Sequence, residues 1–508
     1  MIKYKCFVLI LFIFLLNSMI FAEIFNVEKV IFLTINNNPN LLIEKQNILS
    51  SQADVSLANS EFDSNWILFA NATQDNTPLQ AANIPFYTTN QIENDYITYG
   101  LNHSKKLSNG IIMSNELKFE RNFDNSSPTS VEKSNSSIVL SFDIPLLAGK
   151  GDFASLQKKA AYKVLNAQIN DYEYSVAKVV SDAILLYYKC IGTQESLDIL
   201  KKSEQSMEQI KNDTQRLIKA NEAPAAELKK VESGLANRIS QRIMGETELF
   251  ECFQNIGLIT GKPFDEFENI EIENVEYPIP EDFEIQNIDL NDIIQKSMII
   301  RKDIQAYKLR LEAAQNILKY AKDKMQNNVS LELKADVKGL SEYNNAHSFS
   351  KAWSENKSDT SYSATVKRVF SGNRNSDRNF YQKSLADYNK MQIAYSEIKR
   401  NAKSEITIMY KKLAGNWNRL QKIKQAIEFS EFSLDAEKKK LKLGMTTVLD
   451  VINVEDSYNS TYLNYIQTKV EFIHSIVEFA RITGNLIEIK DNGKINIINL
   501  IFSKNIQE

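Results

Sequence analysis

The stretch LGMTTVLDV, at Leu443–Val451, interrupts a long charged helical pattern for only a few residues. Gly444 can adopt the left-handed conformation that commonly ends a helix. Thr446 or Thr447 can then cap a new helix, because a threonine side chain accepts a hydrogen bond from a backbone N–H of the first turn. The stretch therefore predicts the turn of a helical hairpin, followed by a single acid, Asp450, in an otherwise apolar run.

A second stretch, ANEAPAAEL at Ala220–Leu228, repeats this layout 223 residues earlier. Asn221 corresponds to Gly444, and asparagine is the next best residue after glycine for the left-handed position. Pro224 suits the first turn of a returning helix. A single acid, Glu227, follows here as well. The sequence thus predicts two related helical hairpins.

The chain as a whole consists of two copies of one unit. With a shift of 223 residues, 155–261 aligns with 378–484 without a gap, and both segments end in ITG. With a shift of 263 residues, 25–70 aligns with 288–333. The ungapped alignments indicate rigid helices. Because the shifts of 263 and 223 differ by 40, we expect an insertion of that length in the first copy, between 70 and 155.

Each copy is expected to run in the order helix, strands, long helix, turn and returning helix. Apolar residues in the first long helix have the alternating spacing of an antiparallel coiled-coil seam. The first repeat, 23–261, comprises a helix over 41–62, strands within about 64–147, a long helix over 154–218, a tip at 220–226 and a returning helix to 260. The second repeat, 288–484, comprises strands within about 328–370, a long helix over 376–442, a tip at 443–448 and a returning helix to 483, followed by a tail, 485–508.

Between the helices the apolar period changes to two, which is typical of strands with one apolar and one polar face. Asn328–Gly339 shows this most clearly, and the other candidates are Trp66–Gln74, Ile97–Leu107, Ile111–Phe123, Ser136–Ile144 and Tyr362–Phe370. Such strands form either a membrane barrel or a soluble sheet packed on one face. In lipid, six strands are too few to close a barrel, and each unpaired backbone group at an edge costs several kcal/mol. A membrane barrel would therefore be shared between protomers.

The N-terminus has two lysines, the apolar run Phe7–Leu16 and a small residue at Ala22, the order of a secretory signal peptide over 1–22. An uncleaved membrane anchor is the alternative. The 60 basic and 64 acidic residues are spread along the chain, which predicts no nucleic-acid face. The three histidines are scattered, and we find no phosphate-binding loop and no catalytic spacing. We therefore expect no metal site, no cofactor and no enzymatic activity.

The two acids that follow the turns invite a functional interpretation. Burial of the Asp450 carboxylate among its apolar neighbours would cost free energy, unless the side chain faces water or a partner. If several chains surround an axis, Asp450 and Glu227 would form rings of carboxylates, which select for cations at a constriction. The alternative is that both acids sit in the first turns of their helices because the helix dipole favours them there.

The cysteines and the segment between the repeats give two further expectations. Cys190 and Cys252 lie 31 residues before and 31 residues after Asn221, so an antiparallel hairpin places them at one level. A disulfide is one interpretation and two buried free thiols are the other. The segment 262–292 contains eleven acidic residues and one lysine, and we interpret it as a solvated strap that joins the repeats.

These features together resemble the TolC-like family of outer-membrane factors over nearly the whole mature chain. The residues that carry the resemblance are the two tip motifs NEAPAAEL and GMTTVLDV, the ITG that ends each copy, NPNL at Asn38–Leu41 and IPLLAGKGD at Ile144–Asp152. The resemblance implies a mainly α fold with membrane β: a homotrimer whose long antiparallel coiled coils form a helical barrel in the periplasm and whose strands form a shared twelve-stranded transmembrane β-barrel.

The resemblance also implies a location and partners. The protein would lie in the outer membrane of a diderm bacterium, in contact with outer-membrane lipid. Its tips would dock onto a periplasmic membrane fusion (adaptor) protein of an inner-membrane pump of RND or ABC type. The tip residues are Asn221, Glu222, Ala223, Pro224, Gly444, Met445, Thr446 and Thr447. The gating constriction would comprise Asp450, Glu227 and Asn453, the last at a position where some members carry a second acid.

The expected function is that of a passive exit duct of a tripartite efflux or type I secretion system, gated at the periplasmic tips. The insertion in the first copy raises the number of candidate strands to six per chain, which would give eighteen in three chains instead of twelve. We expect four membrane strands per chain, with the extra hairpin lengthening the outer loops. The alternative function is a soluble periplasmic coiled-coil scaffold or adaptor.

Overall fold

The computed structural model describes residues 23–79, 91–124, 132–220, 224–262, 270–272, 277–280, 283, 289–342, 345–353, 359–369, 373–489 and 495–497. The described residues divide into two compact units. Unit 1 is formed from Met1–Asn47, Ile169–Ala306 and Ser396–Glu508, and unit 2 from Ile48–Gln168 and Tyr307–Tyr395. The expected signal peptide and most of the acidic segment between the repeats lie outside the described residues.

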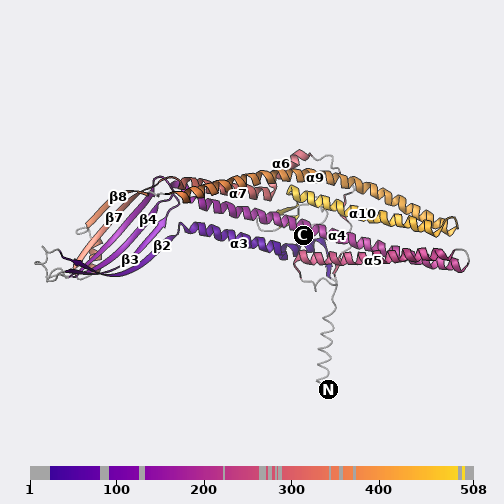
Figure 1. Cartoon of the computed structure of the whole chain (residues 1–508), viewed down its shortest axis with the longest axis horizontal. Coiled ribbons are helices and arrows are strands. Elements are labelled where there is room, and N and C mark those ends of the chain that lie inside the picture. The colour runs from indigo at the N-terminus through magenta and orange to yellow at the C-terminus, as the bar shows by residue number, and fades with distance from the viewer. Residues whose placement is uncertain are drawn as a thin grey trace, which may run out of the picture. The chain divides into compact units, whose positions relative to one another are not determined.

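The chain is mainly helical, and two long helices turn back into shorter partners (Figure 1). α4 (Leu156–Lys219) is followed by α5 (Ala225–Thr260), and α9 (Asn375–Lys442) by α10 (Val448–Thr483). The other helices are α2 (Val27–Asn37), α3 (Pro39–Ser60), η2 (Gly151–Ser155), α6 (Leu290–Ile300), α7 (Lys302–Lys324) and α8 (Asn345–Trp353). No helix in the described part of the chain combines the length and the apolar character needed to cross a membrane.

The strands of unit 2 form one antiparallel sheet of order β2-β3-β4-β5-β7-β8. Their bounds are β2 (Ser64–Pro78), β3 (Gln91–Lys106), β4 (Ile112–Asp124), β5 (Lys133–Pro145), β7 (Asn328–Glu342) and β8 (Asp359–Val369). Unit 1 contains short strands: β1 (Glu23–Phe25) pairs in parallel with β6 (Ile270–Ile272), and β9 (Ile487–Ile489) pairs antiparallel with β10 (Ile495–Ile497).

The expectation that the extra hairpin lengthens the loops is wrong. β2 corresponds to β7 and β5 to β8 in the repeat, so β3 and β4 are the additional strands. They pair with each other from Asn94↔Asp124 to Lys106↔Ile112, and each pairs along its length with the strand on its other side. A hairpin adds one strand in each direction, so it enters an antiparallel sheet without reversing any other strand.

The sheet has one apolar and one polar face. A row of apolar residues crosses five strands through direct pairs; it consists of Leu68, Leu101, Leu117, Ile138 and Val337. The side chains on this apolar face include Leu68 and Tyr362, which are 85% and 81% exposed. The opposite, polar face carries Glu116, Lys118, Asp143, Glu332, Lys334 and Lys367. The alternation read from the sequence is therefore present in the sheet, with an exception in β2, where Ile67 and Phe69 lie on the polar face.

The core of unit 1 lies along the helical hairpins. The predicted seam of α4 is buried along its length; it consists of Val176, Val180, Ala183, Tyr187 and Cys190. It packs with Ile256 of α5 and with Ile473 and Val477 of α10. Burial of such aliphatic side chains contributes roughly 1.5–3 kcal/mol each, which stabilises a pair of helices whose outer faces are charged.

A buried ion pair joins α6, α7 and α10 in unit 1. Arg301 and Asp303 are 4% and 6% exposed, and Arg301 donates to both carboxylate oxygens of Asp303, at 3.1 and 2.7 Å. Its guanidinium also donates to the carbonyl oxygen of Ile482, at 3.2 Å. The charges are thus taken out of water together, with their hydrogen bonds satisfied.

Replacing Arg301 with Met should lower the free energy of unfolding by about 3 kcal/mol, because it leaves the Asp303 carboxylate buried without its partner. Denaturant melts of the detergent-solubilised protein measure this change. Arg216→Met is the control, since its partner Asp213 and Arg216 itself are exposed and the change should cost under about 1 kcal/mol. Equal losses in the two variants would contradict the assigned role of the buried pair.

Candidate functional site at the helical turns

The turn between α9 and α10 has the geometry that its glycine predicts. Gly444 has a φ of +68°. Its backbone N–H donates to the carbonyl of Leu441 at 3.0 Å. The N–H of Met445 donates to the carbonyl of Lys440 at 2.9 Å. This pair of bonds satisfies two carbonyl groups at the end of α9, and it requires the left-handed conformation that glycine adopts without strain.

α10 begins with a capping box around Thr447. The Thr447 hydroxyl oxygen accepts from the N–H of Asp450 at 3.2 Å, and the Asp450 carboxylate accepts from the N–H of Thr447 at 3.1 Å. The hydroxyl of Thr446 lies 3.2 Å from the same carboxylate and 2.5 Å from the carboxylate of Glu437 in α9. The hydrogen bonds from Thr447 and Thr446 hold the pKa of Asp450 below its ordinary value.

Asp450 therefore has a local role at the start of its own helix. Asp450 and Asn453 are exposed on α10, whereas Val448 and Val451 are buried. A capping box satisfies backbone donors that a helix start leaves open, which explains an acid at this position without any partner. A ring of acids around an axis stays a prediction for an assembly of several chains.

The turn between α4 and α5 is described in part. Asn221, Glu222 and Ala223 lie outside the described residues. Pro224 is exposed and occupies the N-cap of α5, one residue before the helix and not inside its first turn as expected. Its carbonyl accepts from the N–H of Glu227 at 3.0 Å. Glu227 is half-buried in the first turn, where the helix dipole favours an acid.

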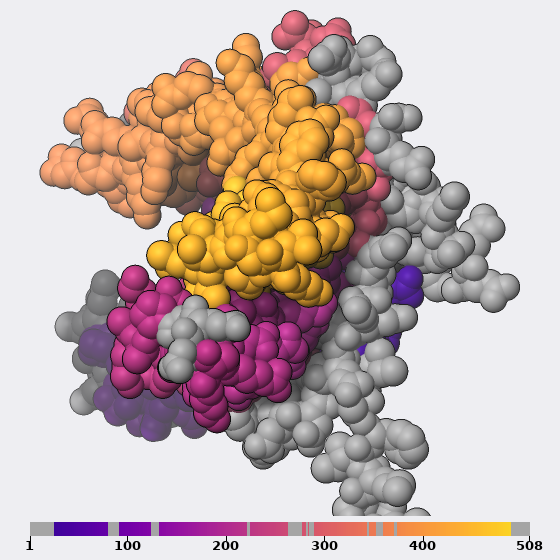
Figure 2. Space-filling view, turned by 90° about the vertical axis from the view of Figure 1, so that its right-hand side faces the viewer, coloured from indigo at the N-terminus to yellow at the C-terminus, as the bar shows by residue number. Residues whose placement is uncertain are grey.

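The two hairpins of unit 1 pack against each other near their turns. Figure 2 looks onto these turns, with α4 and α5 in magenta beside α9 and α10 in orange and yellow. Met207 of α4, Val231 of α5 and Val448 of α10 form a small apolar cluster, which Leu441 and Ile452 extend. This cluster holds the start of α10 against the first hairpin.

A buried arginine links three helices slightly farther from the turns. Arg238 of α5 is buried and donates to the hydroxyl of Ser203 in α4 and to the carboxylate of Asp456 in α10, the latter at 2.9 Å. Asn459 of α10 also donates to Ser203, at 3.0 Å. Because a buried guanidinium is costly without acceptors, moving α10 away from the first hairpin would require a new partner for Arg238.

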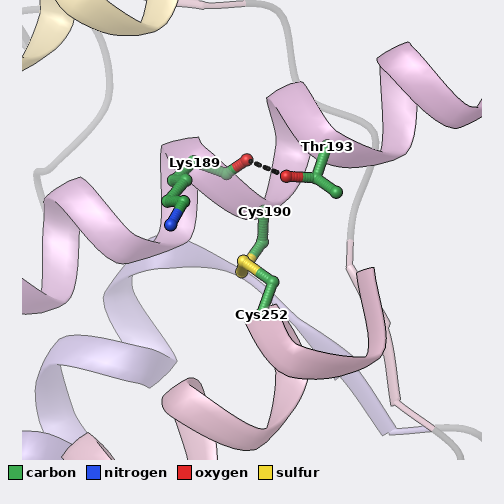
Figure 3. The surroundings of a disulfide bond; sticks show 4 residues. All are labelled: Lys189, Cys190, Thr193 and Cys252. Atoms are coloured by element: carbon green, nitrogen blue, oxygen red, sulfur yellow. Dashed lines mark hydrogen bonds between the residues drawn. A yellow bond between two sulfur atoms is a disulfide. The ribbon is translucent and has the colours of Figure 1, made fainter. Parts of the chain in front are cut away.

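A disulfide joins the two helices of the first hairpin (Figure 3). Cys190 in α4 and Cys252 in α5 are buried, with their Cα atoms 5.6 Å apart. Of the two interpretations that the sequence left open, the structure has the bonded one. The bond fixes α4 to α5 in the core of unit 1. The two helices therefore cannot separate at the level of the disulfide.

Residues of the segment between the repeats are anchored by aromatic side chains. Tyr277 lies beside Tyr188, with 5.9 Å between ring centroids, and the Lys469 ammonium lies 4.4 Å from the Tyr277 ring centroid. Phe283 lies against Trp417 and Phe472, at 5.6 Å from each ring. The expected strap is thus fastened to α4 and α10 at Tyr277, and to α9 and α10 at Phe283.

Comparison with protein-family models and with curated proteins finds no match. Solved structures do match. The outer-membrane channel OprN is 14% identical with a TM-score of 0.64, over 90% of this chain and 90% of that chain. The CmeC outer membrane channel of Campylobacter jejuni is 13% identical with a TM-score of 0.64, over 90% and 85%. The outer membrane protein VceC of Vibrio cholerae is 13% identical with a TM-score of 0.62, over 90% and 96%.

These likenesses establish the fold. The chain has the fold of outer-membrane channels over nine tenths of its length, and the resemblance stated from the sequence is confirmed at that level. The sequence located both turns and narrowed the capping residue of α10 to Thr446 or Thr447, of which the structure has Thr447. It did not indicate Arg238, although a signal was present. Val231, Arg238, Gly245 and Cys252 follow one another at intervals of seven residues, and all four are buried on one side of α5.

The disulfide should be present in the protein exported to an oxidising compartment. Mass spectrometry of unreduced peptides should show Cys190 linked to Cys252. Cys252→Ser should lower the free energy of unfolding by about 2–4 kcal/mol, since the bond closes a loop of 62 residues. Recovery of both cysteines as free thiols, or an unchanged unfolding midpoint in the variant, would contradict the bonded state.

The capping role of Asp450 can be separated from its charge. Asp450→Ala removes the acceptor for the N–H of Thr447, and amide exchange in the first turn of α10 should accelerate by about fivefold. Asp450→Asn retains an acceptor oxygen and should change exchange much less. Because the folded-state pKa is lowered, the wild-type cap contributes fully above the ordinary pKa of an aspartate and weakens as the pH falls through the lowered value. Equal exchange in the Ala variant and the wild type would exclude the cap.

Proposed function

We propose that the protein is a passive exit duct of a diderm outer membrane, built from three copies of the chain. The observation that carries this proposal is the two-faced six-stranded sheet in a chain with the fold of outer-membrane channels. Its apolar face exposes Leu68, Ile97, Tyr362 and Val366. An exposed apolar surface that spans a whole sheet indicates contact with lipid or with a protein partner.

The open edges of the sheet support assembly of several copies. β2 and β8 are the end strands, and β8 is exposed along its whole length. In lipid, every unpaired backbone group at these edges costs several kcal/mol, so the edges must be paired. β2 and β8 run in opposite directions because an even number of antiparallel strands lies in the sheet, so β8 of one copy can pair antiparallel with β2 of the next.

Three copies with six strands each would close a barrel of eighteen strands. Barrel diameter grows roughly linearly with strand number, so this barrel would be about one and a half times as wide as one of twelve. The polar face would line the lumen with paired charges, such as Lys118 with Glu120 at 2.8 Å and Lys367 with Glu332 at 2.5 Å. The lumen of the duct would thus be wide and filled with water where it crosses the membrane.

Closure of the duct would lie at the helical turns. Asp450 and Glu227 follow the two turns, so three copies around an axis would place six carboxylates at that end of the helical barrel. Opening is a population shift in which the second hairpin moves away from the first. This movement would break the bond between Arg238 and Asp456, while the disulfide would keep the first hairpin together.

Exposed apolar side chains at the tips suit docking of a periplasmic adaptor protein. Leu443 and Met445 project from the turn after α9 and are exposed. The duct is passive in this proposal, and an inner-membrane pump of RND or ABC type would drive the export through the adaptor.

Neutralising the tip acids should reduce cation selectivity in planar bilayers. Asp450→Asn with Glu227→Gln keeps side-chain size, and the ratio of K⁺ to Cl⁻ permeability should fall roughly by half or more, because a ring of carboxylates attracts cations. Asp213→Asn, an exposed acid of α4, is the matched control and should leave the ratio unchanged. An unchanged ratio in the double variant would exclude the gate, and a chain that leaves vesicles in buffer without detergent would exclude the duct.

A further inference from the structure

The short helix α8 (Asn345–Trp353) lies between β7 and β8 in the chain and packs back onto the sheet. Phe349 and Asn345 of α8 contact the apolar face, whereas Lys351 lines a cavity with Lys118 and Glu120 of the polar face. Phe349 lies 5.8 Å from the ring of Phe119 in β4. The Asn345 amide donates to the hydroxyl of Tyr99 in β3, at 2.7 Å. Tyr99 and Phe119 stack on each other on that face. α8 is therefore a fixed part of the apolar face.

The surface beneath α8 is built to admit a helix. Ser134 and Ser136 of β5 are each 1% exposed, and Gly339 and Ser341 of β7 are buried beside them. Ser348 of α8 is fully buried against this patch. The same strands carry large exposed residues farther along, such as Leu140 and Leu333. Small side chains under the helix and large ones beyond it define where α8 ends and where the open apolar surface begins.

The position of α8 along the strands matches the edge of a membrane's apolar layer. Apolar residues of this face run along β5 from Ile144 to Ile138, and α8 covers the next two residues of the face, Ser136 and Ser134. From Ile144 to Ser136 the strand rises about 26 Å. A membrane strand tilted by about 40° would cover roughly 20 Å of this along the membrane normal, close to the roughly 25 Å height of the apolar band of outer-membrane barrels.

α8 leaves the assembly edges open. It packs on β7, β5 and β4, which lie inside the sheet. β8, an end strand, is exposed at every residue. α8 is thus not a cover for an unpaired edge, and a second copy could pair with β8 while α8 remained in place.

We infer that α8 is an interfacial helix that lies at the level of the lipid headgroups of the outer leaflet, on the lipid side of the barrel. This inference rests on the proposed function. The helix NAHSFSKAW combines Phe349 with the small polar residues Ser348 and Ser350 and contains no acidic residue, which suits the polar boundary of a bilayer. Phe349 keeps 36% of its surface exposed beside the sheet, where it can contact the upper ends of acyl chains.

Depth-dependent fluorescence quenching tests this inference. An environment-sensitive fluorophore is attached to a single new cysteine in the intact assembled protein, in vesicles of phosphatidylcholine with one part in five phosphatidylglycerol. Three sites are compared: Ser350→Cys on α8, Leu68→Cys on the open apolar face and Asn135→Cys on the polar face. Ser350 and Leu68 are exposed, and Asn135 lies between the two serines that α8 covers. The native pair is disulfide-bonded and does not react.

The label at Ser350 should be quenched at least about threefold more by a nitroxide on the lipid headgroup than by one deep in the acyl chain. The label at Leu68 should show the reverse order, and the label at Asn135 should respond to neither. A Ser350 label that behaves like the Asn135 label, or that responds best to the deep nitroxide, would overturn the inference while the proposed function stands. A Leu68 label that responds to neither nitroxide would overturn both.

Discussion

The proposed duct depends on backbone pairing at the two edges of the sheet. A sheet with one apolar face can enter lipid only if no strand is left unpaired, because lipid supplies no hydrogen-bond partners. The six-stranded sheet of unit 2 ends in β2 and β8, which have opposite directions and open edges. In the proposed duct, further copies would pair with these edges and close the barrel, and they would thereby form a shared lumen, a ring of helical turns and a wall that faces lipid.

The helical hairpins of unit 1 consist of long charged helices, and these need specific interactions to stay packed together in water. A narrow apolar seam, a buried arginine and a disulfide fasten unit 1 internally. The interactions that hold the helices together differ between the two hairpins. The covalent bond joins α4 to α5, whereas α10 is joined to them near its turn by a small apolar cluster and by polar contacts. Near the turns, separation of the second hairpin from the first would therefore break only non-covalent contacts.

Features set by local chemistry were predictable from the sequence. Gly444 and Thr447 fix a turn through their own backbone and side-chain bonds, and the six strands follow from alternation within each segment. The paired cysteines were foreseeable because equal rise on two antiparallel helices places residues equidistant from a turn at one level. The position of β3 and β4 in the sheet was not predictable from the sequence. An alternating hairpin can lie in a long loop or in a sheet, and only its pairing with distant strands decides between the two. The contacts of Arg238 and of α8 depend on distant segments in the same way.

Cross-linking between the edge strands of neighbouring copies tests directly whether several copies share one barrel. Cysteines are placed in pairs on the polar side of β2, at Asn71, and of β8, at Ser361, Ser363 or Thr365, in the chain extracted from membranes in mild detergent. If several copies share one barrel, at least one pair should give covalent dimers and trimers under oxidation. A monodisperse monomer in detergent, with every such pair unlinked, would contradict the shared barrel.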